Sequence, residues 1–142
     1  MTMLVIDSSV AIKWLVAEPY SIDARRILDD YQNGYLSFIA PDLINAEIGN
    51  IIWKKHILQG MAASDAQDIL KEFQAIQFTF TSTAILLNDA YHLAVTHRRT
   101  VYDALYLALS RQENCRMVTA DEKLVNAVGE SFANLVWLPK WP

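Results

Sequence analysis

The sequence predicts an α/β fold with three layers, α/β/α, in which a central, mainly parallel sheet carries helices on both faces. Short apolar runs typical of strands alternate along the chain with segments of helical spacing, and parallel strands are usually joined by helices that cross over the sheet. The length of 142 residues, 53% of them hydrophobic, is typical of one domain with one substantial core. We therefore expect a single domain over residues 1–142.

The first strand and the next two helices are predicted from apolar spacing and from residues that favour helix ends. Met3–Ile6 is a short apolar run, and either Ser8 or Ser9 could cap the helix that follows it. Ser21 could cap a second helix, and the Asn-Gly pair at 33–34 is typical of its end. We therefore expect helices over about 8–16 and 21–31.

A second strand and two further helices follow. Leu36–Ala40 has the apolar character of a strand. Pro41 suits the first turn of a helix that runs to about Gln59, where Gly60 would stop it. The segment that begins at Ser64, Ser-Asp-Ala-Gln, matches a capping box and predicts a helix to about residue 75.

Three more strands and three more helices are predicted in the second half of the chain. The same patterns, a strand-like apolar run or a helical repeat of apolar residues, distinguish them. The strands are Gln77–Thr81, Arg116–Thr119 and Leu135–Leu138, and the helices are about Thr83–Thr96, Val101–Gln112 and Glu122–Val128.

Composition excludes several classes of protein. The single Cys115 cannot form an intramolecular disulfide and fits a reducing cytoplasm. No basic leader segment or long apolar run is present, so we expect a cytoplasmic protein with no membrane span. Zinc sites built from several cysteines and glycine-rich phosphate loops are also excluded, because the chain has one cysteine and four isolated glycines.

Four acidic residues lie within or directly after apolar segments. Asp7 ends the first strand and Asp121 follows the fourth, whereas Glu47 and Asp103 interrupt apolar helices. Carboxylates are rarely buried unless they are paired or bind a metal. Because ligands of parallel sheets bind beyond the carboxyl ends of the strands, we expect these side chains to share one site. The expected ion is Mg²⁺ or Mn²⁺, which both favour carboxylate oxygens.

Each carboxylate also has an ordinary structural interpretation. Asp7 and Asp121 could cap the helices that follow them, and Glu47 could pair with a lysine of its own helix, at position 54 or 55. Asp103 could gain ~0.3–1 kcal/mol from its helix dipole, which is too little to offset the burial of an unpaired carboxylate. The metal interpretation is favoured at all four positions, most strongly at Asp103.

The net charge of −4 is a poor guide to nucleic-acid binding. Setting aside the four site carboxylates leaves 12 of the 16 acidic residues against 12 basic ones. The remaining scaffold is neutral, and divalent ions would neutralise the site where a phosphate approaches.

In their order and context, the four acids resemble those of the PIN-domain ribonucleases, and most closely the VapC-like toxins of prokaryotic toxin–antitoxin pairs. Each matching segment alone is a weak pattern, but all four in this order form a specific one over residues 5–124. The segments are Val5–Val10, Pro41–Asn50, Val101–Ser110 and Val118–Leu124.

The resemblance implies a PIN-like fold and a metal-dependent endoribonuclease that leaves a 3′-hydroxyl and a 5′-phosphate. The four acids match the family's metal-binding and catalytic quartet, and Ser9 and Thr119 match hydroxyl positions often found beside it. The resemblance also implies a homodimer and a cognate antitoxin, which inserts a segment into the active-site groove.

Basic residues near the predicted site are candidates for contact with RNA phosphates. The pair at 98–99 ranks first, because it directly precedes the helix of Asp103. The candidates are Lys13, Lys54, Lys55, Arg98 and Arg99.

The main alternative is a catalytically inactive PIN-like module that binds RNA or protein. Such a module would be expected to lose some of the acids, and this chain has all four. Two other Mg²⁺-dependent classes are disfavoured by the segment around Asp7. A phosphoacceptor receiver domain would need adjacent acids there, and a haloacid-dehalogenase-type phosphatase would need Asp-x-Asp, but the chain has Ile-Asp-Ser-Ser at 6–9.

Overall fold

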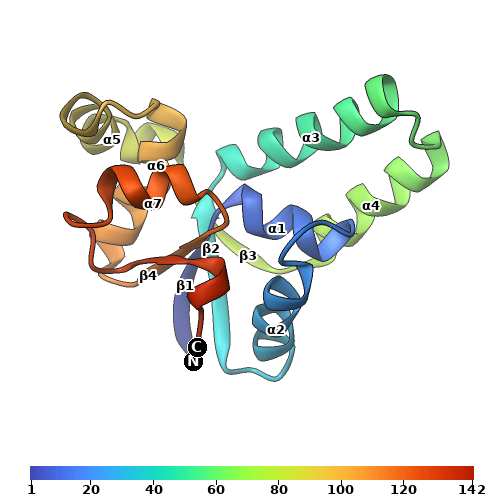
Figure 1. Cartoon of the computed structure of the whole chain (residues 1–142), viewed down its shortest axis with the longest axis horizontal. Coiled ribbons are helices and arrows are strands. Elements are labelled where there is room, and N and C mark those ends of the chain that lie inside the picture. The colour runs from blue at the N-terminus through green and yellow to red at the C-terminus, as the bar shows by residue number, and fades with distance from the viewer.

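The computed structural model describes residues 1–142 and contains one five-stranded sheet, in the order β3-β2-β1-β4-β5 (Figure 1). Every neighbouring pair of strands is parallel. The predicted, mainly parallel sheet is therefore confirmed, and it is parallel throughout. The strands are β1 (Thr2–Ile6), β2 (Leu36–Pro41), β3 (Phe78–Thr81), β4 (Arg116–Thr119) and β5 (Leu135–Trp137).

Seven α-helices connect the strands and cover both faces of the sheet. They are α1 (Ser8–Leu15), α2 (Ser21–Gln32), α3 (Leu43–Gln59), α4 (Ala63–Ala75), α5 (Thr83–His97), α6 (Val101–Glu113) and α7 (Glu122–Val128). Helices α1 to α4 lie on one face and α5 to α7 on the other, as right-handed crossovers in this strand order require (Figure 1). The three-layer arrangement is confirmed. None of the helices has the length and apolar character needed to cross a membrane.

One hydrophobic cluster of 35 buried residues joins the sheet to the helices of both faces. Helix α6 is central to it, because it contacts β1, β2 and β4 and all of its residues from Ala104 to Ser110 are buried. The prediction of a buried helix here is confirmed from Ala104 onward. Asp103, in the first turn, remains partly exposed at the edge of the sheet.

Four helix starts differ from the predictions based on capping residues. At the first, Ser8 and Ser9 are already helical, and Asp7 takes the N-cap position of α1. Pro41 is the last residue of β2, paired with β3, and does not lie in the first turn of α3. Ser64 is not a cap, because α4 already begins at Ala63 and has no side-chain cap. Ser21 is the first residue of α2, and its hydroxyl bonds to the backbone of residues 16 and 18. A cap contributes ~0.5–2 kcal/mol, less than the burial that determines where a helix begins.

The chain changes direction across the sheet between β1 and β4. From β1 it adds β2 and β3 on one side, and it then returns to add β4 and β5 on the other. The segments that leave the carboxyl ends of β1 and β4 therefore lead to opposite faces. Such a reversal opens a crevice at the carboxyl edge of an α/β sheet, where ligands bind.

Candidate active site

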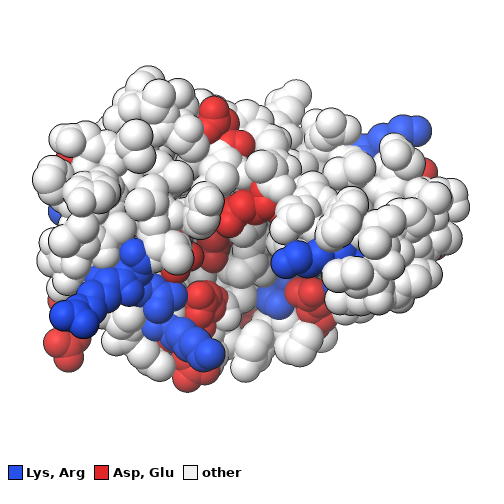
Figure 2. All heavy atoms as spheres, turned by 90° about the horizontal axis from the view of Figure 1, so that it is seen from above, with Lys and Arg blue, Asp and Glu red and all other residues white.

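The predicted carboxylates gather at the reversal between β1 and β4. Asp7 follows β1 directly, and Asp121 lies just beyond the end of β4. Glu47 comes from α3, and Asp103 comes from the first turn of α6, which packs against both strands. Figure 2, which views the molecule from above the strand ends, shows acidic side chains along a hollow in the middle of this face. Four separate segments thus contribute acids to one edge of the sheet.

Asp7 is the centre of a hydrogen-bond network that joins the ends of β1 and β4. Its Oδ2 accepts hydrogen bonds from the hydroxyls of Ser9 at 2.6 Å and Thr119 at 2.7 Å. Ser9 Oγ accepts from the backbone N–H of Ala120 at 3.0 Å, and Thr119 Oγ1 accepts from that of Asp121 at 3.1 Å. The two predicted hydroxyl residues therefore hold Asp7 relative to the segment that carries Asp121.

The capping interpretation fails for Asp7 and holds for Asp121. Asp7 occupies the N-cap position of α1, but its side chain makes no capping hydrogen bond, and Ser8 and Ser9 are already helical. Asp121 Oδ1 accepts a hydrogen bond from the backbone N–H of Leu124 at 3.2 Å and so caps α7. The carboxylate of Asp7 is thus oriented by the site and not by its own helix.

The pKa of Asp7 is raised from 3.8 to about 6, the net result of three effects of which burial is the largest. The hydrogen bonds from Ser9 and Thr119 lower it, because they stabilise the charged form. The negative charges of Glu47 and Asp103 raise it further. Asp7 therefore lies within electrostatic reach of two other members of the predicted quartet.

Glu47 is held by Tyr106, a residue that the sequence analysis did not include in the site. The Tyr106 hydroxyl donates a hydrogen bond to Glu47 Oε1 at 2.5 Å. Burial raises the pKa of Glu47, an effect that the hydroxyls of Tyr106 and Ser8 partly offset. Burial and the charges of Asp7 and Glu47 also raise the pKa of Tyr106, so it stays a donor. The position of Tyr106 one helical turn after Asp103 is the sequence feature from which its place in the site could have been predicted.

Asp103 and Asp121 contact the same guanidinium. Arg99 Nη2 lies 3.0 Å from Asp103 Oδ2 and 3.7 Å from Asp121 Oδ2. Thr100 caps α6 by accepting the backbone N–H of Asp103 at 3.1 Å, so the Asp103 carboxylate is not needed as a cap. Both acids are partly exposed, Asp103 in the first turn of α6 and Asp121 at the N-cap of α7.

The other basic candidates differ in their surroundings. Lys13 is only 8% exposed and its Nζ lies 3.1 Å from Glu18 Oε1, which argues against the predicted contact with RNA. Lys55 shares this acid at 3.5 Å and so does not form the disfavoured alternative, a pair with the glutamate of its own helix. Lys54 is exposed on α3, and Arg98 is exposed at the end of α5.

The donor atoms of the site suit a hard cation, although their arrangement does not enclose one. Carboxylate oxygens are the ligands that Mg²⁺ and Mn²⁺ prefer. No group of three or more His, Cys, Asp or Glu side chains is placed to hold an ion. Each acid is instead engaged by hydroxyls, by a guanidinium or by a backbone N–H. Ion binding therefore requires some of these side chains to rotate.

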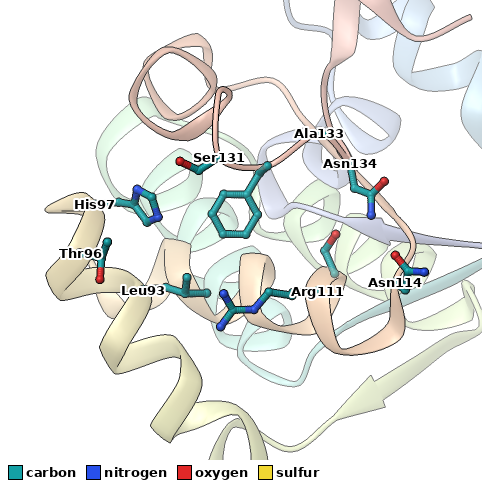
Figure 3. A pocket seen from close by; sticks show the side chains of 10 residues that line it. Leu93, Thr96, His97, Arg111, Asn114, Ser131, Ala133 and Asn134 are labelled. Carbon is teal, nitrogen blue, oxygen red and sulfur yellow. The ribbon is translucent and has the colours of Figure 1, made fainter.

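A pocket of about 580 Å³ lies at the other end of α6, away from Asp103 (Figure 3). Side chains of α5, of the last turn of α6 and of residues 131–134 surround it, among them His97, Arg111 and Asn134. None of its lining residues is acidic. This pocket is therefore separate from the carboxylate site.

Comparisons with known proteins agree with the fold and give the family. A model of the PIN domain matches residues 4–130. Ribonuclease VapC3 of Pyrobaculum aerophilum is 34% identical over 138 residues, which cover 94% of this chain and 97% of the relative. The crystal structure of PAE2754 from Pyrobaculum aerophilum has a similar fold, with a TM-score of 0.70 and 21% identity over 97% of this chain and 85% of that one. The structure of VapBC2 from Rickettsia felis bound to a DNA fragment from their promoter has a TM-score of 0.64 and 11% identity, over 96% and 97% of the chains.

In metal-free buffer, Asp7→Asn should raise the free energy of unfolding at pH 7.5 by about 1–3 kcal/mol. The folded-state pKa of about 6 exceeds the ordinary value of 3.8, so the folded protein binds the proton more tightly than the unfolded chain. Ionised Asp7 therefore destabilises the fold above pH 6, and this penalty disappears as the pH falls towards 4. Urea unfolding at pH 7.5 and 4 measures the effect, with Asp68→Asn on the exposed face of α4 as the control. A gain of the same size at both pH values would contradict the assignment.

Tyr106→Phe should lower the free energy of unfolding by about 1–2 kcal/mol, because it removes a hydrogen bond to a partly exposed carboxylate. The matched control is Tyr102→Phe on the same helix, whose side chain is 62% exposed. Urea unfolding at neutral pH provides the comparison. If the two variants are equally stable, the bond to Glu47 contributes nothing to the fold.

Proposed function

The chain belongs to the PIN domain family, and we propose that it is an endoribonuclease of the VapC type that uses Mg²⁺ or Mn²⁺ and acts as the toxin of a toxin–antitoxin pair. An enzyme of this kind hydrolyses RNA phosphodiester bonds with water that a metal ion activates. Support comes from the family match, from the name of the curated relative and from the carboxylate site.

The observation that carries the proposal is the partly buried Asp7 carboxylate, which lies within electrostatic reach of Glu47 and Asp103. Burial and repulsion by these two acids raise the pKa of Asp7 to about 6. Strongly perturbed carboxylates at the strand reversal of an α/β sheet are typical of a functional site. A divalent cation is the partner that would remove both the repulsion and the cost of burial.

In the proposed reaction, the four acids would supply the oxygens that hold the ion, and neighbouring hydroxyls hold two of these acids. Ser9 and Thr119 orient Asp7, and Tyr106 orients Glu47. When bound, the ion would lower the pKa of a water molecule and stabilise negative charge on the phosphate. The scissile phosphate would lie in the acidic hollow of Figure 2.

The proposed RNA path follows the acidic hollow between basic side chains. Figure 2 shows Lys and Arg side chains on both sides of the acids. Lys54 on α3 and Arg98 at the end of α5 are exposed, and these two helices cover opposite faces of the sheet. Phosphates on either side of the cleaved bond would therefore meet a cation, which supports binding that weakens as salt rises.

We also propose that the protein forms a homodimer and binds a cognate antitoxin. The antitoxin follows from the toxin role. For the dimer, the support is an apolar face on α5, where Leu87, Tyr91 and Val95 recur every four residues and are 53%, 55% and 61% exposed. A row of large apolar side chains in solvent is typical of an interaction surface.

One observation favours the alternative function, a PIN-like module that binds RNA or protein without catalysis. No three of the acids are arranged to hold an ion as the side chains now lie. The two functions differ in whether the carboxylates bind a divalent cation, so metal binding is the measurement that separates them.

Calorimetric titration of Mn²⁺ into the metal-free protein should show saturable binding, and Asp103→Asn should weaken it about tenfold or more, since it removes a charged ligand. Asp68→Asn, an exposed change of the same kind on α4, should bind Mn²⁺ as the wild type does. Cleavage of RNA by the wild type should require the ion and should be lost in Asp103→Asn. Absence of Mn²⁺ binding in the wild type would favour the non-catalytic module.

Light scattering at micromolar concentration should give about twice the chain mass of 16.1 kDa. Tyr91→Asp should shift the protein towards the monomer, because it places a charge in the apolar face of α5. Gln67→Asp, on the exposed face of α4, should leave the dimer intact. A wild-type mass equal to one chain would overturn the proposed dimer.

A further inference from the structure

Arg99 points into the acidic site and not outward to a substrate. Its place before the helix of Asp103 predicts a contact with RNA, but its Nη2 lies 3.0 Å from Asp103 Oδ2 and 3.7 Å from Asp121 Oδ2. Its side chain is only 24% exposed, and its Nε is buried. The guanidinium therefore contacts two of the acids that the proposed function assigns to the metal ion.

The connection between α5 and α6 holds the Arg99 backbone in this place. Arg98 ends α5 in the left-handed conformation, with φ of 53°. The Arg99 N–H bonds to the carbonyl oxygen of Ala94 at 3.1 Å, and Thr100 caps the start of α6. Arg99 is thus anchored to both helices, four residues before Asp103. This turn directs the Arg99 side chain towards the carboxylates, whereas the Arg98 side chain remains exposed.

Another cation can displace Arg99 from Asp103 and Asp121, because the geometry of these contacts is not the strongest that arginine can form. Arginine binds a carboxylate most strongly when two N–H groups meet two oxygens. Here a single nitrogen, Nη2, makes both contacts, and the buried Nε has no hydrogen-bond partner. Both carboxylates are also partly exposed, at 31% for Asp103 and 38% for Asp121, so solvent weakens the attraction.

We propose that Arg99 is a built-in counterion, which holds Asp103 and Asp121 in the metal-free protein and competes with the divalent ion for their oxygens. This inference rests on the proposed function, because it takes the same acids as the metal site. It explains why no three acids are placed to hold an ion while the guanidinium is among them. When the ion enters, Arg99 leaves these oxygens and is free at the edge of the hollow.

Calorimetric titration of Mn²⁺ into metal-free wild type, Arg99→Gln and Arg98→Gln tests the competition. The two variants lose the same charge at neighbouring positions, but only Arg99 contacts the acids. Arg99→Gln should bind Mn²⁺ roughly three- to fivefold more tightly than the wild type, as the loss of a partly exposed ion pair predicts. Arg98→Gln should change the affinity less than about twofold. Arg99→Lys, which keeps the charge, should stay near the wild type.

Thermal unfolding in metal-free buffer gives a second readout. Arg99→Gln should unfold at a lower temperature than Arg98→Gln, because two neighbouring carboxylates lose their counterion. A purely structural role would lower thermal stability and Mn²⁺ affinity together, whereas competition changes them in opposite directions. If the wild type binds Mn²⁺ and the two glutamine variants bind it with equal affinity, the inference is overturned and the proposed function stands. Absence of binding in the wild type and all variants would overturn the proposed function, and the inference with it.

Discussion

The partly buried carboxylate of Asp7, held by the hydroxyls of Ser9 and Thr119, joins the two strands between which the chain changes direction. Asp7 and Thr119 are 112 positions apart in sequence, but Asp7 Oδ2 and Thr119 Oγ1 lie 2.7 Å apart in the structure. A carboxylate that is largely removed from solvent is tolerated only when such partners are present. Because the same hydroxyls accept backbone N–H groups at the start of the next segment, the network also positions Asp121. The rest of the site is arranged around this connection.

The clustering of acidic side chains destabilises the folded protein, and neighbouring hydroxyl and guanidinium groups reduce this destabilisation. Burial raises the pKa of both Asp7 and Glu47, which shows that the charged forms are disfavoured there. The hydroxyl of Tyr106 contacts Glu47, and the guanidinium of Arg99 contacts Asp103. A site that is destabilised until its ligand arrives is common in enzymes, where function and stability have different requirements. The net charge of −4 conceals this local arrangement of acids flanked by cations.

Much of the fold could be predicted because secondary structure follows from properties of short segments. Apolar spacing was sufficient to place all five strands and all seven helices, in the order that a parallel sheet requires. The same reasoning placed Asp7 and Asp121 after strand ends, where the site lies. The start of α3 at Pro41 and the cap at Ser64 were wrong, because pairing between strands and burial of helices outweigh the preference of a single capping residue.

The partners of the acids could not be predicted in this way. Tyr106 reaches Glu47 from 59 positions away, and Lys55 pairs with Glu18 instead of the glutamate of its own helix. Arg99, expected to face RNA, turns towards Asp103 because of the conformation between α5 and α6. The sequence by itself determined the elements, their order and the acids that the strand ends carry, since these depend on local spacing and residue type. Only the tertiary structure decided which side chain each acid meets, because those contacts depend on packing between segments that are far apart in the chain.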